Sequence, residues 1–585
     1  MIQILTNHLG YLSGDYKKAV LQGEQGMSVD AFRLIDSQGK CVFQGTAQEC
    51  GTVAEWKTGY YWTLSFSEFQ EPGTYILKAD TSEGCVSSYP FEITEFLQDL
   101  RMLNAVSYYF KAQRSTGEWA EKDSALPFEG EREGMVDAHG GWLDATGDYG
   151  IHMSHLSHST VCNPQQVPFS AYVFFKAVEH LQKNMPQSTL LIRRMLDEGS
   201  FGADFIMRMR APSGSFFRSI NRTDSFGSAR NTREIGLEYR RSSSQFSEKA
   251  ATADEETVTD ANYETSFRSG GGLCIAALAA AARHFYPGTD YNGGEYLLAA
   301  KDAFAWLWEH NESYCNDGEW NLLDEYCALL AAAELYRSSS EYVYLCRARE
   351  LAERMLGRME KTGDDTVWFY SRPGEPFCHA AEEGIPVVAL LTFLEMEPDA
   401  ENRKRTLGAV EKAMRHMLAI TKKVINPFGY ARYFHRCPDG GTKEKFFYFH
   451  DNPAAPWWQG DNARLASCAC AAWMTAAVTK DMELAEELKA FAQDQINWIM
   501  GLNPFDACMI EGYGRNNISY FFNGRYDFLN CPGGICNGIT SRPDNEEGIF
   551  FLREPAEEIY DNWRWAEQWI PHNSWFIYAL AVKKG

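Results

Sequence analysis

The sequence predicts a mainly α-helical protein in which a small all-β domain precedes a large helical barrel. Two observations lead to this fold class. Short β-rich runs fill the first 95 residues, and such runs, divided by turn residues, are typical of a sandwich. From about residue 96 the apolar residues recur at the i, i+3, i+4 spacing of packed helices. We therefore expect two domains, over residues 1–95 and 96–585.

The β-rich runs are short and evenly spaced. They read KKAVLQG, SVDAFRLID, KCVFQGTA, YYWTLSFSEF and GTYILKAD, with Gly, Asp, Ser and Pro between them. Gly and Pro at such short intervals end one strand and turn the chain into the next. These runs predict the strands of the small sandwich.

About a dozen helical segments follow, for example FSAYVFFKAVEHLQKN, NLLDEYCALLAAAELYR and NARLASCACAAWMTAAV. Loops rich in Trp, Tyr, Gly and Asp separate them. A dozen antiparallel helices with loops gathered at one end predict a ring of helical hairpins, an (α/α)6 barrel. Loops at one mouth of such a scaffold would build a site.

One polar stretch, Ser219–Gly272, has few aliphatic residues and no clear periodicity. Two interpretations stay open: a lid or cleft wall beside the site, or a tolerated surface loop.

Composition restricts the partners and the location. The chain has 585 residues and a formal net charge of −24. This charge argues against nucleic acid and anionic membranes as partners, since both need a basic surface. There is no run of about 18 apolar residues for a membrane span. The opening residues lack a signal-peptide pattern, and many of the 15 cysteines lie in apolar helical segments, so we expect a cytoplasmic protein.

The stretch HGGWLDATGDYGIH places Asp144 and Asp148 four residues apart in a glycine-rich, aromatic setting. A carboxylate pair on such a loop can hold a water molecule and take its proton. The alternative is an Asx-turn followed by a helix cap at Asp148. A glycosidase would also need a proton donor on the opposite face of the sugar.

A candidate donor is Glu567, which lies between Trp565 and Trp569 in the C-terminal segment. Desolvation by aromatic neighbours can raise the pKa of a glutamate, as an acid catalyst requires. The alternative is a solvated glutamate on an amphipathic terminal helix.

These motifs together resemble glycoside hydrolase family 9. GGWLDATGD (Gly140–Asp148) is similar to the family's Gly-Gly-Trp-Tyr-Asp-Ala-Gly-Asp motif, and AEQWIPHNSWFIYALA (Ala566–Ala581) to its last motif. NWIMGLNPFDACMIEGYGRN (Asn497–Asn516) resembles a third family segment, and the opening residues resemble its immunoglobulin-like domain. The resemblance implies an inverting mechanism, with Asp148 as general base, Asp144 helping to hold the water and Glu567 as general acid.

Two departures bear on the substrate. Thr146 is an extra residue between the aspartates, as in a subgroup acting on glucosamine-containing oligosaccharides from the chain end. The family's usual His-x-Arg element is not recognisable after the Gly-x-Gly segment, where Asn517–Gly538 stands instead. We therefore expect an exo-β-glucosaminidase on chitosan-type oligomers, with an oligosaccharide substrate as its partner. An endo-β-1,4-glucanase and a non-catalytic carbohydrate-binding protein remain alternatives.

Aromatic and hydrogen-bonding side chains near these motifs are the expected sugar contacts, because sugar rings stack on aromatic faces. They are Trp142, Tyr149, Trp457, Trp458, Gln459, Asn462, Arg464, Tyr513, Arg515, Trp569 and Asn573. For the Trp457–Trp458 pair and Arg464 the alternatives are a loop anchor and a helix cap.

We expect no metal and no cofactor. His152, His155, His158 and Cys162 are spaced like zinc ligands, but they follow the aspartate loop, where polar residues facing the mouth are expected. Turn chemistry explains CPGGIC (Cys531–Cys536) better than a disulfide does. No nucleotide-binding fingerprint occurs, since Gly270–Gly272 lacks a P-loop lysine.

Overall fold

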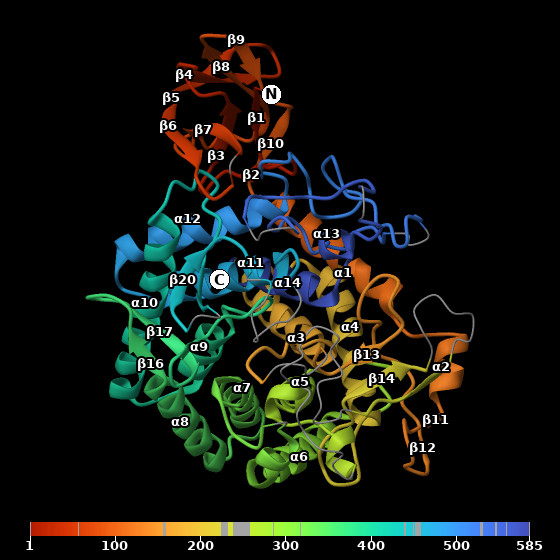
Figure 1. The fold of residues 1–585 in the computed structure, drawn as a ribbon. Coiled ribbons are helices and arrows are strands. Elements are labelled where there is room, and N and C mark those ends of the chain that lie inside the picture. The colour runs from red at the N-terminus through yellow and green to blue at the C-terminus, as the bar shows by residue number, and fades with distance from the viewer. Residues whose placement is uncertain are drawn as a thin grey trace.

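The computed structural model shows a β-sandwich on one side of a helical barrel (Figure 1). The residues it describes are 2–56, 58–155, 160–223, 232–237, 258–284, 286–315, 317–437, 440–448, 450, 458–526, 530–543, 547–556 and 559–583, without the side chains of 97 and 98. Most of the Ser219–Gly272 stretch and Trp457 lie outside these residues.

Two sheets form the sandwich. One contains, in order, β1 (Gln3–Leu5), β3 (Lys18–Gly23), β7 (Thr58–Ser65) and β6 (Gln48–Val53). The other runs β2 (Tyr11–Leu12), β10 (Phe91–Thr94), β8 (Gly73–Thr81), β4 (Val29–Asp36) and β5 (Cys41–Thr46), with β9 (Gly84–Ser87) on β8. Alternate residues such as Leu21, Leu34 and Leu77 point inward and are fully buried, as the pleat of a half-buried strand requires.

Six almost fully buried helices form an inner ring. They are α3 (Val167–Asn184), α5 (Gly272–Ala281), α7 (Leu322–Ser339), α9 (Ile385–Met396), α11 (Asn462–Val478) and α14 (Ile570–Lys583). Each contacts the next, and α14 closes the ring against α3. Every residue of α5 is buried, because a helix surrounded by other helices must be apolar all round.

Six outer helices each pack on one inner helix. They are α1 (Leu97–Gln113), α4 (Thr189–Arg208), α6 (Gly293–Tyr314), α8 (Tyr342–Gly357), α10 (Ala400–Lys422) and α12 (Met482–Ile499). Their one-sided apolar patterns cover the ring from outside. The predicted (α/α)6 barrel and the all-β domain before it are confirmed.

Connection lengths place the site. Short turns link most inner helices to the following outer helix, for example α11 to α12. Long connections precede every inner helix except α7, which begins at Leu322 soon after α6 ends at Tyr314, so they gather at the end where the inner helices begin. These long loops carry the short strands β11 (Leu126–Pro127), β12 (Met135–Val136), β13 (Ile151–His152), β14 (Ser219–Arg222), β15 (Arg233–Ile235), β16 (Met359–Lys361), β17 (Val367–Arg372), β18 (Glu375–Pro376), β19 (Tyr433–Arg436) and β20 (Thr442–Lys445), and the short helices α2 (Glu118–Asp123) and α13 (Trp563–Ala566).

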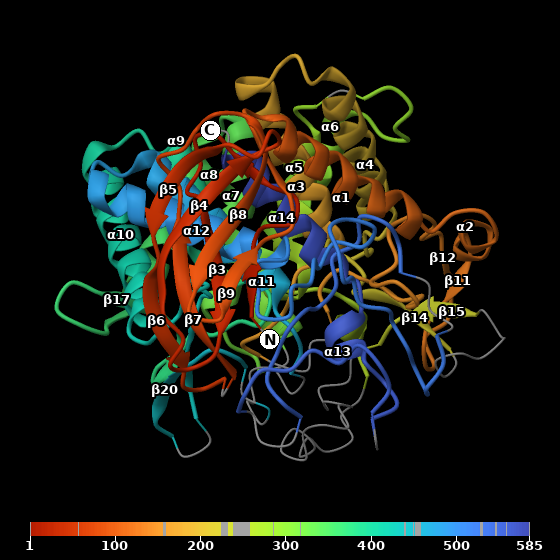
Figure 2. The same ribbon diagram turned by 90° about the horizontal axis from the view of Figure 1, so that it is seen from above.

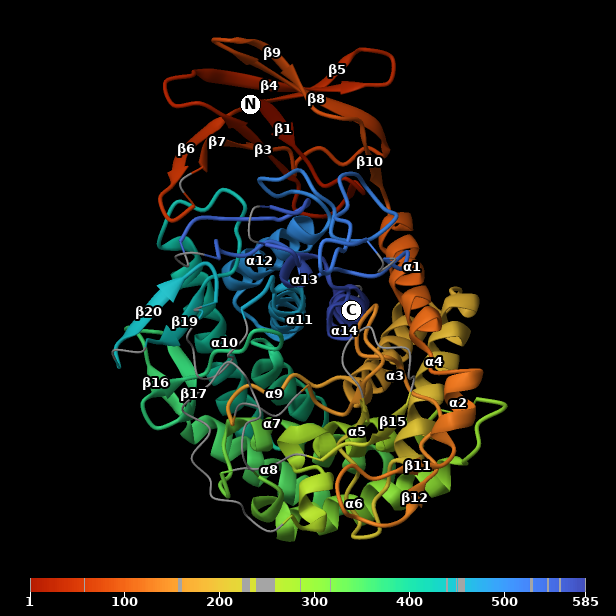
Figure 3. The same ribbon diagram turned by 45° about the vertical axis from the view of Figure 1, so that its right-hand side comes forward.

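The sandwich lies over α12 and the loops that follow it, as the view from above and the turned view show (Figures 2 and 3). The Lys18 ammonium binds the Asp494 carboxylate on α12 at 2.7 Å, with both side chains at most 10% exposed. Lys583 at the end of α14 binds Asp15 and Asp99. Asp99 belongs to the barrel helix α1, whereas the pairs of Lys18 with Asp494 and of Lys583 with Asp15 join the sandwich to the barrel.

The predicted division at residue 95 stays a prediction; β10 ends at Thr94 and α1 begins at Leu97. Among the described residues, no helix combines the length and the apolar character needed to cross a membrane.

Candidate active site

The aspartate loop lies directly before the first inner helix of the chain, and Glu567 lies directly before the last. Since α14 is the neighbour of α3 in the ring, these two loops meet. The backbones of Ala145 and Trp569 form a β-bridge, and the Ile570 amide donates to the Asp144 carbonyl at 3.1 Å. Gly147 has a φ of +87°, which a residue with a side chain rarely adopts.

Asp144 is buried and held by two imidazoles. Its Oδ2 atom lies 3.0 Å from His152 Nδ1 and 3.4 Å from His155 Nδ1. Burial acts to raise the pKa of Asp144, but the charge of His152 and the hydrogen bonds from both histidines lower that pKa well below its ordinary value. The group is therefore an ionised carboxylate.

Asp148 is more open, with 32% of its side chain exposed. Its Oδ1 atom accepts the Gly150 amide at 3.0 Å, so the Asx-turn interpretation is correct in part. No helix begins at Asp148, because the chain continues into β13. The Arg222 Nε atom lies 3.9 Å from Asp148 Oδ1.

Glu567 follows the short helix α13 and keeps some exposed surface. Burial of its carboxyl and the negative charges of Asp148 and Asp144 raise the pKa of Glu567 to about 8, against a hydrogen bond to Asn537 that lowers it. Below that pH this carboxyl carries a proton. The tryptophans flanking it are buried.

A hydrogen-bonded clamp built around Gln568 joins the two loops. The Thr146 amide donates to the Gln568 carbonyl at 2.9 Å, and the Thr146 hydroxyl to Gln568 Oε1 at 2.8 Å. Tyr109 also donates to the Gln568 carbonyl, at 2.9 Å. Gln568 Nε2 and Oε1 bind the Cys531 carbonyl and amide at 3.0 and 2.7 Å. The extra residue Thr146 thus fixes the aspartate loop relative to Glu567.

Several residues predicted to contact the sugar are buried and bonded to other residues of the protein. The Trp142 ring is fully buried and donates to Glu198 at 3.2 Å. Arg464 is fully buried and binds Glu383 and Asp461, and Asp461 is the N-cap of α11. These side chains pack and pair within the barrel, which corrects the expectation that they face a sugar.

Two predicted asparagine contacts are likewise structural. Asn462 Nδ2 donates to the Cys536 carbonyl at 2.8 Å. Asn573 accepts the Ile535 amide at 2.9 Å and donates to the carbonyls of Val106 and Gly533. Both side chains are at most 1% exposed. Each asparagine ties the loop before α14 to the barrel.

Arg515 lies at the junction with the sandwich. It binds Asp506 through two nitrogens, at 2.8 and 2.6 Å, and lies 4.1 Å from the ring centre of Tyr89. Asp506 is also bound by His8, at 2.9 Å. Tyr513, two residues before Arg515, is partly buried on the same loop. Arg515 therefore joins the domains.

The remaining predicted contacts stay near the mouth. Tyr149 is 37% exposed and stacks on Trp119 with ring centres 5.1 Å apart. Trp569 is next to the aspartate loop and contacts His155 edge-on. Trp458 stacks on His450 at 4.1 Å, and Gln459 is buried beside it. Trp457 lies outside the described residues.

Other residues at the site have no predicted counterpart. Tyr520 is buried, and burial together with the charges of Glu567 and Asp148 raises its pKa above the ordinary value. Tyr109 and Gln568 belong to the clamp. Only the position of Gln568 beside Glu567 could have indicated its role from the sequence.

Two of the histidines that are spaced like zinc ligands bind a carboxylate. Within the described part of the chain, no three His, Cys, Asp or Glu side chains are arranged to hold a metal ion. His158 lies outside it. His152 and His155 bind Asp144 as hydrogen-bond donors, and Cys531 and Cys536 are free thiols.

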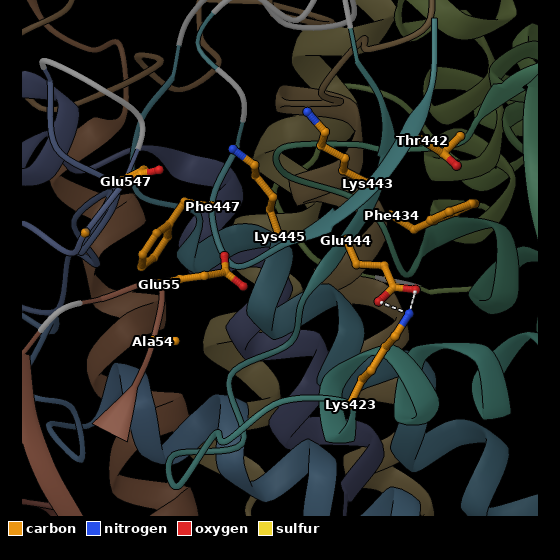
Figure 4. Close-up of a pocket in the computed structure, with 11 residues that line it drawn as sticks. Ala54, Glu55, Lys423, Phe434, Thr442, Lys443, Glu444, Lys445, Phe447 and Glu547 are labelled. Atoms are coloured by element: carbon orange, nitrogen blue, oxygen red, sulfur yellow. Dashed lines mark hydrogen bonds and ion pairs between the residues drawn. The ribbon is translucent and has the colours of Figure 1, made fainter. Parts of the chain in front are cut away.

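A separate cavity of about 550 Å³ lies between the sandwich and the β19–β20 hairpin (Figure 4). Glu55 from the sandwich and Lys443 and Lys445 from β20 line it, and Lys423 pairs with Glu444 at 2.9 Å. None of the three candidate catalytic carboxylates lines this cavity.

The three carboxylates of the mouth differ in their surroundings. Asp144 is ionised between two imidazoles, Asp148 is open to solvent, and Glu567 holds a proton at neutral pH. Carboxyl groups whose pKa values are driven apart in this way divide acid and base roles between them. Such a set can activate a water and protonate a leaving oxygen.

Comparison with known proteins agrees with this chemistry. The chain matches the models of "Glycosyl hydrolase family 9" over residues 101–525 and of "Cellulase N-terminal ig-like domain" over residues 2–83. The xyloglucan-specific endo-beta-1,4-glucanase BoGH9A of Bacteroides ovatus is 23% identical over 587 residues, which cover 95% of this chain and 89% of that protein.

Solved structures show the same fold. A metagenome-derived glycoside hydrolase family 9 endoglucanase superposes with a TM-score of 0.66 at 16% identity, covering 100% of this chain and 99% of its own. A Bacteroides ovatus GH9 structure gives 0.64 at 19%, covering 99% and 98%. Because the family model spans most of the sequence, this chain belongs to glycosyl hydrolase family 9 and is an inverting O-glycosyl hydrolase with an N-terminal immunoglobulin-like domain.

Proposed function

We propose that this enzyme hydrolyses β-1,4 bonds of gluco-configured oligosaccharides, with Asp148 as general base and Glu567 as general acid. Asp148 takes a proton from the attacking water, which Asp144 helps to hold, while Glu567 protonates the leaving oxygen. The observation that carries the proposal is the raised pKa of Glu567 beside two aspartates. A carboxyl that keeps its proton at neutral pH can act as the acid.

We propose chitosan-type oligomers, cleaved one glucosamine at a time from the chain end, as the first substrate class. The support is Thr146, the extra residue of the aspartate loop, whose hydroxyl binds Gln568 at 2.8 Å. Because Thr146 bonds to the residue after Glu567, the four-residue spacing of Asp144 and Asp148 is part of the geometry of this site.

A second candidate is endo-acting hydrolysis of a β-1,4-glucan. The specific support is the relative over 95% of this chain, which is named a xyloglucan-specific endo-beta-1,4-glucanase. In either case Tyr149, Trp569 and Tyr520 are the side chains we propose to contact the sugar, since they lie beside the carboxylates.

The test is product analysis on chitosan oligomers, cello-oligosaccharides and xyloglucan, with Glu567→Gln as the blank. Glu511→Gln is the matched control, because Glu511 is another partly buried glutamate with a raised pKa, hydrogen-bonded to Asn530. If wild type and Glu511→Gln release single glucosamine units from chitosan oligomers and Glu567→Gln does not, the glucosaminidase proposal is supported. Mixed-length glucans from the others support the endo-glucanase. If the blank matches wild type throughout, Glu567 is not the acid.

We also propose a reducing, cytoplasmic location. Ten of the fifteen cysteines are buried as free thiols, which is usual for proteins of reducing compartments.

A further inference from the structure

One oxygen of Asp144 carries both imidazole contacts. His152 comes from β13 and His155 from the extended segment after it, and the Nδ1 atoms of both point at Oδ2. The two rings lie edge-on, 6.1 Å apart. Two N–H donors converging on a single acceptor fix both the rotation and the tilt of a carboxylate.

The other oxygen of Asp144 has no such contact. Asp144 Oδ1 is buried and has no hydrogen-bond partner among the described residues. An anionic oxygen in such a position needs a polar partner, because burying an unpaired charge is costly. A water or a substrate hydroxyl at this atom would supply that partner.

His152 stands between the two aspartates. Burial acts to lower the pKa of His152, but the Asp144 and Asp148 carboxylates and a hydrogen bond with Asn221 raise it above the ordinary value. Asn221 is on β14, the strand paired with β13. A ring with a polar partner on each side is well placed to carry two protons and a positive charge.

The charged groups around this ring come from several elements. Asp144 and Asp148 come from the aspartate loop, and His155 lies on the same extended segment. The β14 residue Arg222 lies near Asp148, and Glu567 interacts with both aspartates from the loop before α14. Within the described residues, His152 is hydrogen-bonded to Asp144, and the charge of Asp148 also acts on its ring.

We propose that His152 and His155 are positioning residues that hold Asp144 by Oδ2, so that its Oδ1 atom faces the attacking water, and that the His152 ring is the counter-ion shared by both aspartates. This inference rests on the roles proposed above for Asp144 and Asp148. The histidines touch no reacting atom and act through Asp144.

Loss of the His152 charge would shift the pH dependence of activity in a defined direction. A nearby cation lowers the pKa of a carboxyl, so the loss of the His152 charge raises the pKa of Asp144 and moves the acid limb of activity to higher pH. Without the His152 charge, the negative charges of Asp144 and Asp148 act more strongly on Glu567 and raise its pKa further. The alkaline limb of activity therefore also moves to higher pH. A purely structural histidine would change the stability and leave both limbs in place.

The test compares His152→Gln and His155→Gln with His416→Gln as the control. His416 is also buried, but it binds Thr362 at 2.8 Å and stacks on Trp368 instead of contacting a carboxylate of the site. We expect His152→Gln to move the acid limb of kcat/KM up by about 1 to 3 pH units and to lower kcat more than it raises KM. His155→Gln should do the same to a smaller extent, because its contact is longer.

A second measurement does not depend on activity. In protein labelled with ¹³C at the histidine ring, the His152 signal, assigned by its loss in His152→Gln (or in His152→Asn, if the first variant does not fold), should titrate above pH 6.5. Unmoved limbs in the histidine variants, or a His152 signal that titrates below pH 6.5, would overturn the inference. An inactive wild type with a signal titrating above 6.5 would instead count against the proposed function alone.

Discussion

Three carboxylic acids at the mouth have almost the same intrinsic chemistry and are set apart by their neighbours. Two imidazoles lower the pKa of Asp144, whereas burial and like charges raise that of Glu567. Asp148 is bound to the Gly150 amide and is one third exposed. Each residue type was visible in the sequence, but its protonation follows from groups that only folding brings near.

We expect the proton on Glu567, the proposed general acid, to set the alkaline limit of activity. Since its pKa is raised to about 8, the acid form is present below that pH and is lost above it. We expect kcat/KM of the wild type to fall above about pH 8, because that parameter reports groups of the free enzyme. A pH–rate profile checks this.

The matched variant is Asp144→Asn, which removes one of the negative charges that raise the pKa of Glu567. Its residual activity should lose the alkaline limb at a lower pH than wild type does. An alkaline limb that stays in place in this variant would contradict the electrostatic coupling.

At the scale of elements, the site is a junction of two loops that lie more than 400 residues apart. The loop before α3 supplies the aspartates and the loop before α14 supplies Glu567. Gln568 and Thr146 join them through side-chain and backbone hydrogen bonds. A small change in this junction would alter the separation of base and acid, and errors of about 1 Å there are costly to the rate.

The side chain of Gln568 makes four hydrogen bonds at this junction. We expect Gln568→Ala to lower the free energy of unfolding by roughly 2–4 kcal/mol and to lower kcat by about 10- to 100-fold. Gln495→Ala is the control: Gln495 is buried on α12 and makes three comparable bonds, none of them to the two loops that carry the carboxylates. Urea unfolding and initial rates measure both; an equal kcat in the two variants would show that the clamp only stabilises.

Trp142 and Tyr149 lie seven residues apart on the same loop, but Trp142 is buried and Tyr149 is exposed. Trp142→Phe removes the bond to Glu198 and part of a packed ring, so we expect a loss of about 1–3 kcal/mol in unfolding free energy and an unchanged KM. Tyr149→Ala should instead raise KM by roughly 2- to 10-fold, the equivalent of a stacking contact, with little change in stability. The reverse pattern would return Trp142 to the sugar site.

At the scale of the whole molecule, ring closure decides which loops share the mouth. The last inner helix packs against the first, so the two ends of the barrel sequence meet. The sandwich is fixed on α12 by the buried pair of Lys18 and Asp494. Removing one partner of a buried pair leaves the other charge uncompensated.

Lys18→Met tests this coupling of the two domains. We expect it to lower the unfolding free energy by about 3–5 kcal/mol. The control Arg33→Met breaks an ion pair with Asp80 that is 38% and 58% exposed, which should cost less than about 1 kcal/mol. Thermal unfolding separates the two; equal losses would mean that the Lys18 pair adds nothing to the interface.

The sequence by itself determined the fold class and the three candidate carboxylates. Strand and helix periods are local properties of the chain, so the sandwich and the barrel helices could be recognised from the spacing of apolar residues. The aspartate pair and Glu567 were visible because each lies in a distinctive glycine-rich or tryptophan-rich segment.

Only the tertiary structure decided which polar residues face the mouth. Trp142, Arg464 and Asn573 look like sugar contacts in the sequence, yet they are buried and paired within the barrel. His152 and His155 look like metal ligands and bind a carboxylate. Burial and hydrogen-bond partners depend on contacts between segments distant in the chain, and no local spacing carries that information.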